Sequence, residues 1–277
     1  MAWRNRLALV AAVCAVAGPL LLSADKPIMI GLIPDGMSQD DREPLQDYLT
    51  KAMGRPVKLE TPERYADTVA RLEDGTYDFA CLGALMYVRS HTKIGVVPLV
   101  RRSTDLQFHS VFITGTGSAI HSLADLKGKK FAFGDVNSAS GHLIPVRELV
   151  KAGVHPDTDL QAQFSGADTV TAALVESGAV DAGALDESVL GSMISTSKIN
   201  ISKVRIFYTS KPFVDYVFVA RKGLSETERE KFAQALLNLK EGKESAVLRV
   251  LRANKFVAAN DEEYDSVRQV VKELNLQ

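Results

Sequence analysis

Short apolar runs alternate with amphipathic segments along this chain, and the alternation occurs in two successive series. The first series runs from Pro27 to Thr114 and the second from Phe131 to Ala220. Apolar runs bounded by turn residues predict buried strands, and the amphipathic segments between them predict helices. Such alternation is typical of βαβ units and a largely parallel sheet. We therefore expect an α/β protein of two lobes in series, with no Pro/Ser-rich linker between them.

The C-terminal part of the chain differs because its pattern is helical throughout. Three helices are expected after Ser225, within 226–239, 244–253 and 261–274. Helices without a sheet must pack on a sheet elsewhere, so we expect them to return to the first lobe. The chain then crosses between the lobes near Thr114–Ser118 and near Ser210–Asp215. This predicts a first lobe of residues 25–115 plus 216–277 and a second lobe of residues 116–215.

The first 24 residues have the pattern of a secretory signal peptide. Arg4 and Arg6 precede an uncharged apolar stretch, Leu7–Leu22, and Ala24 is a small residue at the expected cleavage point. We expect cleavage after Ala24 and a periplasmic or otherwise extracytoplasmic protein. The alternative is an uncleaved membrane anchor.

The composition excludes several other functions. The chain has 33 Lys+Arg against 34 Asp+Glu, and nucleic-acid binding selects clustered Lys and Arg, so no nucleic-acid partner is expected. The five His residues lack metal-ligand spacing, and only one of the 2 Cys, Cys81, lies after the expected signal peptide. We expect no metal, no cofactor and no intramolecular disulfide. Cys81 lies in an apolar strand and is expected to be a packed thiol.

One loop carries a pattern with chemical meaning. Residues 134–140 join an apolar strand to a helix, and Ser138, Ser140 and Gly141 stand at the start of that helix. The first N–H groups of a helix lack intrahelical partners, and together with hydroxyl groups they bind anions without Lys or Arg. Pro145 suits the first turn because a helix start can spare its N–H. The alternative is that a serine here only caps the helix.

Several motifs follow one another in a recognisable order. Leu-Gly-Ala-Leu-Met-Tyr stands at 82–87, and Leu-x-Gly-Lys-Lys-Phe-Ala-Phe at 126–133 leads into Asp-x-x-Ser-x-Ser-Gly at 135–141. Val-Asp-Ala-Gly at 180–183 and Lys-Pro-Phe-Val-Asp at 211–215 come later. In this order they resemble the phosphate/phosphite/phosphonate-binding proteins of ABC importers, over roughly residues 30–239. The resemblance implies the two-lobed periplasmic-binding-protein fold of type 2, with the ligand in a cleft between the lobes.

The resemblance also implies roles for individual residues. In that family the serine loop holds a phosphorus oxyanion, two tyrosines bind the same oxyanion, and a cleft acid meets an ammonium group or a protonated oxygen of the ligand. The ligand-binding set expected here is Tyr65, Tyr87, Ser138, Ala139, Ser140, Gly141, His142, Asp168 and Asp215.

The chain departs from the family pattern at two of these positions. Ala139 stands where the family has Thr, and Asp168 stands where the family has His. A missing hydroxyl and a missing cation weaken the binding of a doubly charged oxyanion, and an extra acid favours a monoanion or a ligand with a cationic end. The alternative for Asp168 is that it caps the helix expected at Thr169–Ser177.

These features favour a non-enzymatic, monomeric binding protein that delivers a small anionic ligand, namely phosphonate, phosphite or phosphate, to an ABC permease in the membrane. A first alternative keeps the fold but presents the ligand to a membrane receptor as a sensor. A second is an enzyme on the same fold acting on a small phosphonate. Such an enzyme needs a nucleophile–base pair or a metal, and the sequence offers neither.

Overall fold

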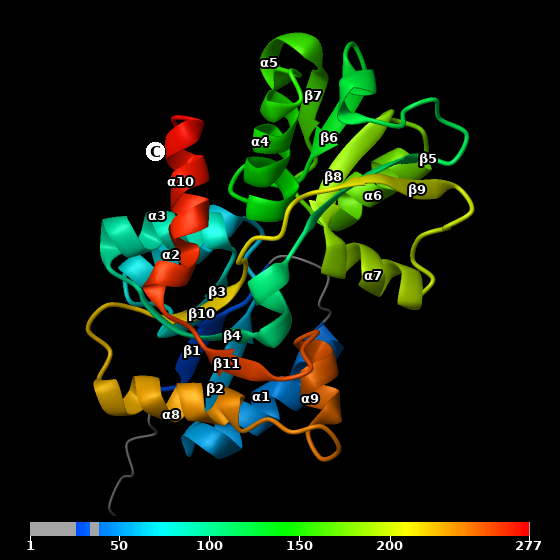
Figure 1. The fold of residues 1–277 in the computed structure, drawn as a ribbon. Coiled ribbons are helices and arrows are strands. Elements are labelled where there is room, and N and C mark those ends of the chain that lie inside the picture. The colour runs from blue at the N-terminus through cyan, green and yellow to red at the C-terminus, as the bar shows by residue number, and fades with distance from the viewer. Residues whose placement is uncertain (1–25, 34–38, 277) are drawn as a thin grey trace, which may run out of the picture.

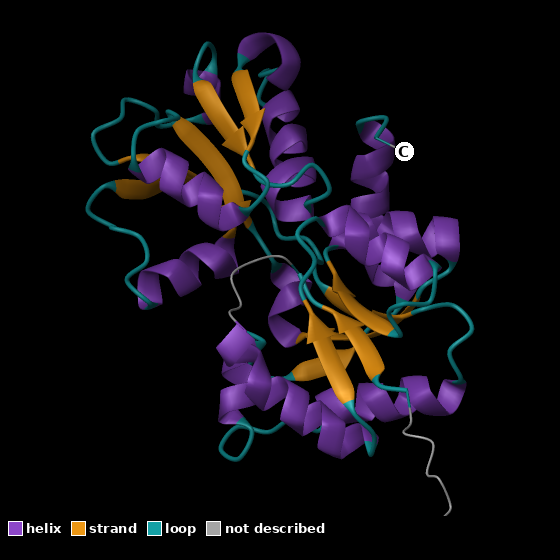
Figure 2. Cartoon of the chain, turned by 180° about the vertical axis from the view of Figure 1, so that it is seen from behind, coloured by secondary structure: helices purple, strands orange, loops and turns teal. Residues whose placement is uncertain are grey.

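Two mixed sheets, each covered by helices on both faces, make up the fold (Figures 1 and 2). The computed structural model describes residues 26–33 and 39–276. The expected signal peptide therefore lies outside the described residues. No helix in the described part of the chain is both long and apolar enough to cross a membrane.

The sheet of lobe 1 combines the beginning and the end of the chain. Its strand order is β11-β4-β10-β3-β1-β2, with β1 parallel to β2 and β3, and β10 antiparallel to its neighbours β3 and β4. The strands are β1 (Ile28–Gly31), β2 (Val57–Glu60), β3 (Phe79–Leu82), β4 (Val97–Arg102), β10 (Val217–Ala220) and β11 (Phe256–Ala258).

Six α-helices cover the two faces of this sheet. They are α1 (Gln39–Met53), α2 (Tyr65–Glu73), α3 (Ala84–Ile94), α8 (Glu226–Leu237), α9 (Ser245–Val250) and α10 (Asp265–Glu273). One apolar core contains residues of α2, α3 and α10, and the other contains residues of α1, α8 and α9. The expected return of the C-terminal helices to the first lobe is therefore observed.

Lobe 2 has a five-stranded sheet of order β7-β6-β8-β5-β9. Its strands are β5 (Ser110–Gly115), β6 (Lys130–Phe133), β7 (Gln161–Phe164), β8 (Ala182–Asp186) and β9 (Val204–Thr209). Its helices are α4 (Ile144–Lys151), α5 (Pro156–Asp159), α6 (Asp168–Glu176) and α7 (Glu187–Ser195). Short helical turns are η1 (Ser103–Gln107), η2 (Leu123–Leu126), η3 (Ala139–Leu143) and η4 (Asp261–Tyr264).

The sequence predicted the position of one connection between the lobes correctly and misplaced the other. The second runs through residues 210–216, between β9 and β10. The first was expected near Thr114–Ser118, but β5 already pairs with β8 and β9 of lobe 2, so the crossing is the earlier segment 103–109. Residues 110–115 thus belong to lobe 2 rather than to lobe 1. The Gly115–Ser118 segment, expected to lie in the crossing, follows β5 within lobe 2.

Two further elements depart from the sequence-based expectation. The C-terminal part is not purely helical, because β11 pairs antiparallel with β4 at the edge of the lobe 1 sheet. Helix α7 was not expected. Its start is marked by Asp186, whose Oδ1 accepts hydrogen bonds from the N–H groups of Ser188 and Val189 at 2.5 and 2.9 Å. An Asp before a helix is a common cap, so this signal was present in the sequence.

Candidate functional site

The serine-containing segment Ser138–His142, called the anion loop below, joins β6 to α4 through a wide π turn. The Leu143 N–H donates to the Ser138 carbonyl five residues back, at 3.1 Å. Pro145 has no N–H to give to the Gly141 carbonyl, and that carbonyl instead accepts from the Gly134 N–H at 2.9 Å. Single π turns inside helices are frequent at functional sites. The proline therefore explains the unusual shape of this helix start.

Two glycines allow the loop to approach the end of β6. A Cβ atom on Gly141 would lie 3.0 Å from the Gly134 Cα, 3.0 Å from Asp168 Oδ1 and 3.2 Å from Ser138 Oγ. Only a residue without a side chain fits such a place. The same geometry puts the Asp168 carboxylate and the Ser138 hydroxyl around one point of the loop.

The two serine hydroxyls of the loop are buried and have different partners. Ser138 Oγ accepts from the Gly141 N–H at 2.9 Å, so Ser138 does cap the helix start, but its own hydrogen remains available for donation. Ser140 Oγ lies 3.5 Å from Ser138 Oγ. The Ser140 carbonyl accepts from Ser110 Oγ of β5 at 2.5 Å, which fastens the loop to the sheet of lobe 2.

The remaining two loop residues do not turn their side chains towards these hydroxyls. The Ala139 methyl is buried in an apolar core that includes residues of lobe 1. The His142 ring packs against Phe133 and Phe164, and its Nδ1 lies 2.8 Å from the Val136 carbonyl. Burial lowers the pKa of His142, which disfavours the charged form. Any contribution of these residues to anion binding comes from their backbone N–H groups.

Asp168 is the first residue of α6 and is 2% exposed. The N-cap of α6 is Ala167, which has no side chain for capping, so Asp168 is not the N-cap that the alternative interpretation expected. A carboxylate in the first turn is stabilised by the helix dipole. Asp168 is thus held beside the anion loop by α6.

Asp215 approaches from the second inter-lobe connection and is 1% exposed. Its Oδ1 accepts from the Ala84 N–H at the start of α3, at 2.8 Å. Its Oδ2 is buried and has no hydrogen-bond partner in the described part of the chain. Burial raises the pKa of Asp215 well above its usual value. One oxygen therefore caps a helix of lobe 1, and the other is available to a ligand.

Tyr216, which the sequence analysis missed, joins the two lobes next to Asp215. Its hydroxyl donates to Asp186 Oδ2 of lobe 2 at 2.7 Å, and the Arg102 guanidinium lies 5.0 Å from its ring centre. Arg102 is in turn paired with the buried Asp105 of η1 at 2.6 Å. The network links both inter-lobe connections. The sequence holds no local signal for it, because its members come from four separate elements.

The surroundings of Tyr216 show which predicted residues converge. Burial raises its pKa well above the usual value, and the charge of Asp186 adds to this effect, followed by smaller contributions from Tyr65, Asp215 and Asp168. These groups are therefore electrostatic neighbours of the Tyr216 hydroxyl. Tyr65 is the first residue of α2 and is 6% exposed.

Tyr87 was expected to bind the oxyanion, and in this structure its hydroxyl has a protein partner instead. Its hydroxyl donates to Asp261 Oδ1 of η4 at 2.5 Å, and its ring packs on Tyr264 with a centroid distance of 4.5 Å. Tyr87 lies three residues after Ala84 on α3, and its hydroxyl is turned towards η4. Its role in the structure is to fasten α3 to η4.

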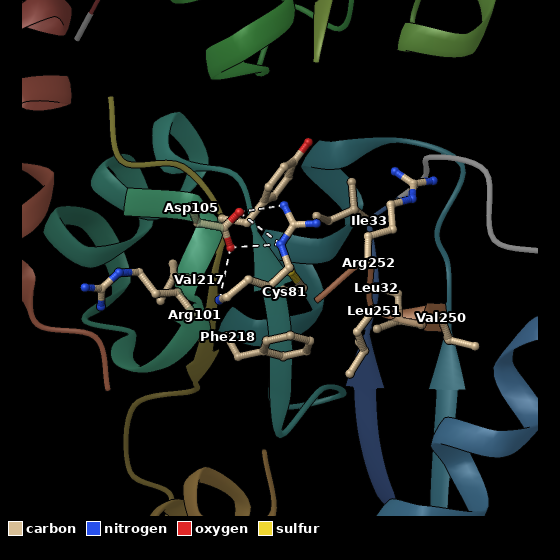
Figure 3. A pocket seen from close by; sticks show the side chains of 12 residues that line it. Leu32, Ile33, Cys81, Arg101, Asp105, Val217, Phe218, Val250, Leu251 and Arg252 are labelled. Carbon is tan, nitrogen blue, oxygen red and sulfur yellow. Dashed lines mark hydrogen bonds and ion pairs between the residues drawn. The ribbon is translucent and has the colours of Figure 1, made fainter. Parts of the chain in front are cut away.

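A cavity of about 80 Å³ lies next to this network in lobe 1 (Figure 3). Its walls are mainly apolar side chains of β10, of α9 and its end, and of the segment after β1, with Cys81 of β3 among them. Cys81 is a free thiol that is partly exposed to this cavity instead of being fully packed, and burial raises its pKa. The cavity contains no residue of the anion loop, so we do not assign the oxyanion to it.

No cluster of three or more His, Cys, Asp or Glu side chains suited to a metal ion occurs in residues 26–33 and 39–276. The candidate residues described above offer backbone N–H groups, hydroxyls and carboxylates. A family model described as the periplasmic substrate-binding protein of phosphonate ABC transporters matches residues 30–264. The chain belongs to this family.

The chain is also similar over most of its length to individual proteins of known sequence or structure. The chain is 28% identical over 274 residues to the probable ABC transporter phosphite binding protein PhnD1 of Prochlorococcus marinus, covering 92% of each protein. The structure of PhnD1 in complex with methylphosphonate matches with a TM-score of 0.83, covering 90% of this chain and 98% of PhnD1. A binding protein component of an ABC phosphonate transporter from Pseudomonas aeruginosa matches at a TM-score of 0.80 and 22% identity, covering 89% of this chain and 86% of that protein.

The fold of this family member is thus the two-lobed periplasmic-binding-protein fold of type 2, as the sequence predicted. The structure places Ser138, Ser140, Gly141 and Asp168 around one loop of lobe 2. Asp215 and Tyr65 stand at helix starts of lobe 1. The side chains of Tyr87 and His142 are turned elsewhere.

Proposed function

We propose that this chain binds a small phosphorus oxyanion, namely phosphonate, phosphite or phosphate, between its two lobes and delivers it to an ABC permease without catalysing a reaction. The observation that carries the proposal is the anion loop. Two buried hydroxyls lie there at a helix start, where the first N–H groups lack intrahelical partners. An extracytoplasmic location fits both the family and the expected signal peptide.

The charges around the loop favour a particular form of the ligand. Asp168 lies beside the loop, and Asp215 keeps one oxygen without a partner. A dianion next to ionised carboxylates is repelled, and the raised pKa of Asp215 means that added negative charge there requires a bound proton or a cation. We therefore propose a singly protonated oxyanion, whose O–H donates to a carboxylate, or an aminoalkylphosphonate, whose ammonium group meets one.

Ligand entry on this proposal requires the lobes to separate. Ser138, Ser140 and Asp215 are 4%, 1% and 1% exposed, so solvent hardly reaches them in this arrangement. The connections 103–109 and 210–216 are the only covalent links between the two sheets within residues 39–276. Rotation about them opens the site, and a ligand that contacts both lobes stabilises the closed arrangement.

A thermal-shift screen tests the proposal directly. Methylphosphonate, phosphite, phosphate and sulfate are added separately to the purified protein. A ligand at 100 times its dissociation constant adds about 2.7 kcal/mol to the unfolding free energy. We expect stabilisation by at least one phosphorus oxyanion and a smaller effect of sulfate, because sulfate has no proton to give to Asp168 or Asp215. No stabilisation by any phosphorus oxyanion would contradict the proposal.

A further inference from the structure

Residues in and next to the anion loop contact lobe 1 on the side of the C-terminal helix α10, apart from the candidate ligand residues. We propose that these contacts form a latch that holds the lobes closed and thereby sets how tightly the ligand is retained. The latch consists of Arg89, Asn137, Arg147, Glu273 and the apolar contact between η3 and α10. This inference concerns the regulation of the proposed ligand site and in that respect rests on the proposed function.

The first polar contact of the latch is made by Arg89 of α3. Its Nη1 donates to Asn137 Oδ1 at 3.2 Å, and Asn137 directly precedes Ser138 of the anion loop. Its Nη2 donates to the Leu276 carbonyl, just after α10, at 2.7 Å. One guanidinium therefore connects the loop of lobe 2 with two helical segments of lobe 1.

The second polar contact is an ion pair between the lobes. Arg147 Nε of α4 lies 3.4 Å from Glu273 Oε2, at the last residue of α10. The two side chains are 25% and 38% exposed. An ion pair of this exposure contributes about 0.2–1 kcal/mol, which is a small bias on the closed arrangement.

Apolar side chains between these polar contacts complete the latch. Leu143 and Ile144, at the end of η3 and the start of α4, are 0% and 2% exposed. They belong to the same apolar core as Val267, Val270 and Val271 of α10. Separation of the lobes at this place would expose these side chains to water, which is unfavourable.

The position of α10 explains how it can respond to lobe movement. The start of α10 adjoins the inter-lobe connection, because the hydroxyl of Tyr264, the residue before α10, donates to the Tyr216 carbonyl at 3.4 Å. Glu273 lies nine residues further, about 13 Å along the helix axis at 1.5 Å per residue. Figure 1 shows α10 rising from lobe 1 beside α3, on the side of α4. A rotation about the connections moves Arg147 away from this far end of the helix.

The substitution Glu273→Gln separates the latch from a simple charge effect. Removing a negative charge should by itself strengthen the binding of an anion. Loss of the ion pair instead shifts the lobes towards the open arrangement and lowers the population that is competent to bind. We expect the dissociation constant for methylphosphonate, measured by calorimetry, to rise about 1.5- to 5-fold. An unchanged or smaller dissociation constant would overturn the proposal.

Matched controls use an ion pair inside lobe 1 and a charge swap. Arg55 and Glu228 lie 3.3 Å apart with exposures of 32% and 34%, close to those of the latch pair. Glu228→Gln removes the same charge as Glu273→Gln and should not raise the dissociation constant for methylphosphonate. The swap Arg147→Glu with Glu273→Arg keeps the net charge and should restore the affinity that Arg147→Glu alone loses. A rise with Glu228→Gln as large as that with Glu273→Gln, or a swap that fails to restore binding, would count against the latch.

A ligand-free measurement distinguishes failure of the latch from failure of the proposed function. Small-angle X-ray scattering should give a larger radius of gyration for Arg147→Glu, in which two carboxylates face each other, than for the wild type and the swapped double variant. Equal radii for all three proteins would overturn the latch. If the wild type does not bind methylphosphonate but the radii differ as expected, the latch stands and the ligand assignment fails.

Discussion

Ser138 and Ser140 are two residues apart and are expected to have different roles, one in helix capping and both in ligand binding. Ser138 Oγ accepts from the Gly141 N–H, so its loss removes a helix cap as well as a donor. No comparable local bond is formed by the Ser140 hydroxyl, whose nearest polar partner is Ser138 Oγ at 3.5 Å. The pair therefore offers an internal comparison of capping with ligand binding.

Ser140→Ala should weaken methylphosphonate binding by about 1.5–3 kcal/mol, the usual range for a hydrogen bond to a charged group. Its unfolding free energy should stay close to that of the wild type. Ser138→Ala should lose about 1 kcal/mol of folding stability in addition, because a cap is removed. Calorimetry and urea unfolding of both variants give the two quantities. If Ser140→Ala binds methylphosphonate as tightly as the wild type, the loop does not bind the ligand through this hydroxyl and only caps the helix.

Asp215 is expected to cost the ligand-free protein stability at neutral and alkaline pH. Burial raises its pKa in the folded state, so the folded protein binds this proton more tightly than the unfolded chain does. The stabilisation is present below the ordinary carboxyl pKa and is lost as pH rises towards the raised value. Asp215→Asn keeps an oxygen to accept from the Ala84 N–H and removes the titration.

The melting temperature of Asp215→Asn should therefore exceed that of the wild type by an amount that grows between pH 4 and pH 8. Thermal unfolding of both ligand-free proteins across this range measures the difference. A constant difference would mean that Asp215 does not titrate abnormally in the folded protein.

Among the helices and strands, the sequence predicted local features better than it predicted which strands pair with one another. The alternation of strands and helices, the loop 134–140 and the start of α8 at Ser225 follow from short-range signals such as caps, glycines and apolar periodicity. The assignment of β5 to lobe 2 depends on its pairing with β8 and β9, which are far along the chain. Strand β11 is too short, at 3 residues, for a periodic pattern.

Tyr87 shows the same limit for a side chain on a correctly located helix. Its motif suggested the oxyanion site, whereas Asp261, 174 residues later, accepts its hydroxyl. Tyr87→Phe should lower the unfolding free energy by about 1.5–3 kcal/mol, because a hydrogen bond to a carboxylate is lost. Methylphosphonate affinity should be unchanged. Weaker binding without a loss of stability would show that Tyr87 contacts the ligand after all.

For the whole molecule, the sequence pattern indicated the serine loop and the family resemblance named Tyr65, Asp168 and Asp215, but nothing indicated the network around Tyr216. Ser138, Ser140 and Gly141 form a contiguous pattern in the sequence. The Tyr216–Asp186 bond joins two lobes across 30 residues, and Arg102 and Asp105 reach it from the other connection. Such an arrangement depends on how the lobes close over one another, which no local pattern encodes.

The sum of charges in the closed molecule leads to a prediction about ligand identity. Asp186 accepts a hydrogen bond from the Tyr216 hydroxyl, the charges of Asp168 and Asp215 also act on that hydroxyl, and Arg102 is already paired with Asp105. A ligand that arrives without a proton or a cationic group adds negative charge to this buried group of acids. Electrostatic repulsion in so poorly solvated a place is costly. The closed arrangement should therefore select ligands by their protonation state as well as by their shape.

Affinity for methylphosphonate should accordingly fall as pH rises and the ligand loses its last proton. An aminoalkylphosphonate should lose less affinity over the same range, because its ammonium group still meets a carboxylate. Asp215→Asn should weaken the aminoalkylphosphonate, whose charge partner it removes, yet leave or improve phosphate binding at high pH. Calorimetric titrations of wild type and variant at pH 5.5 and pH 8 measure all three effects. Tight phosphate binding that strengthens towards pH 8 would refute this selection, because a dianion would then be accepted beside acids that ought to repel it.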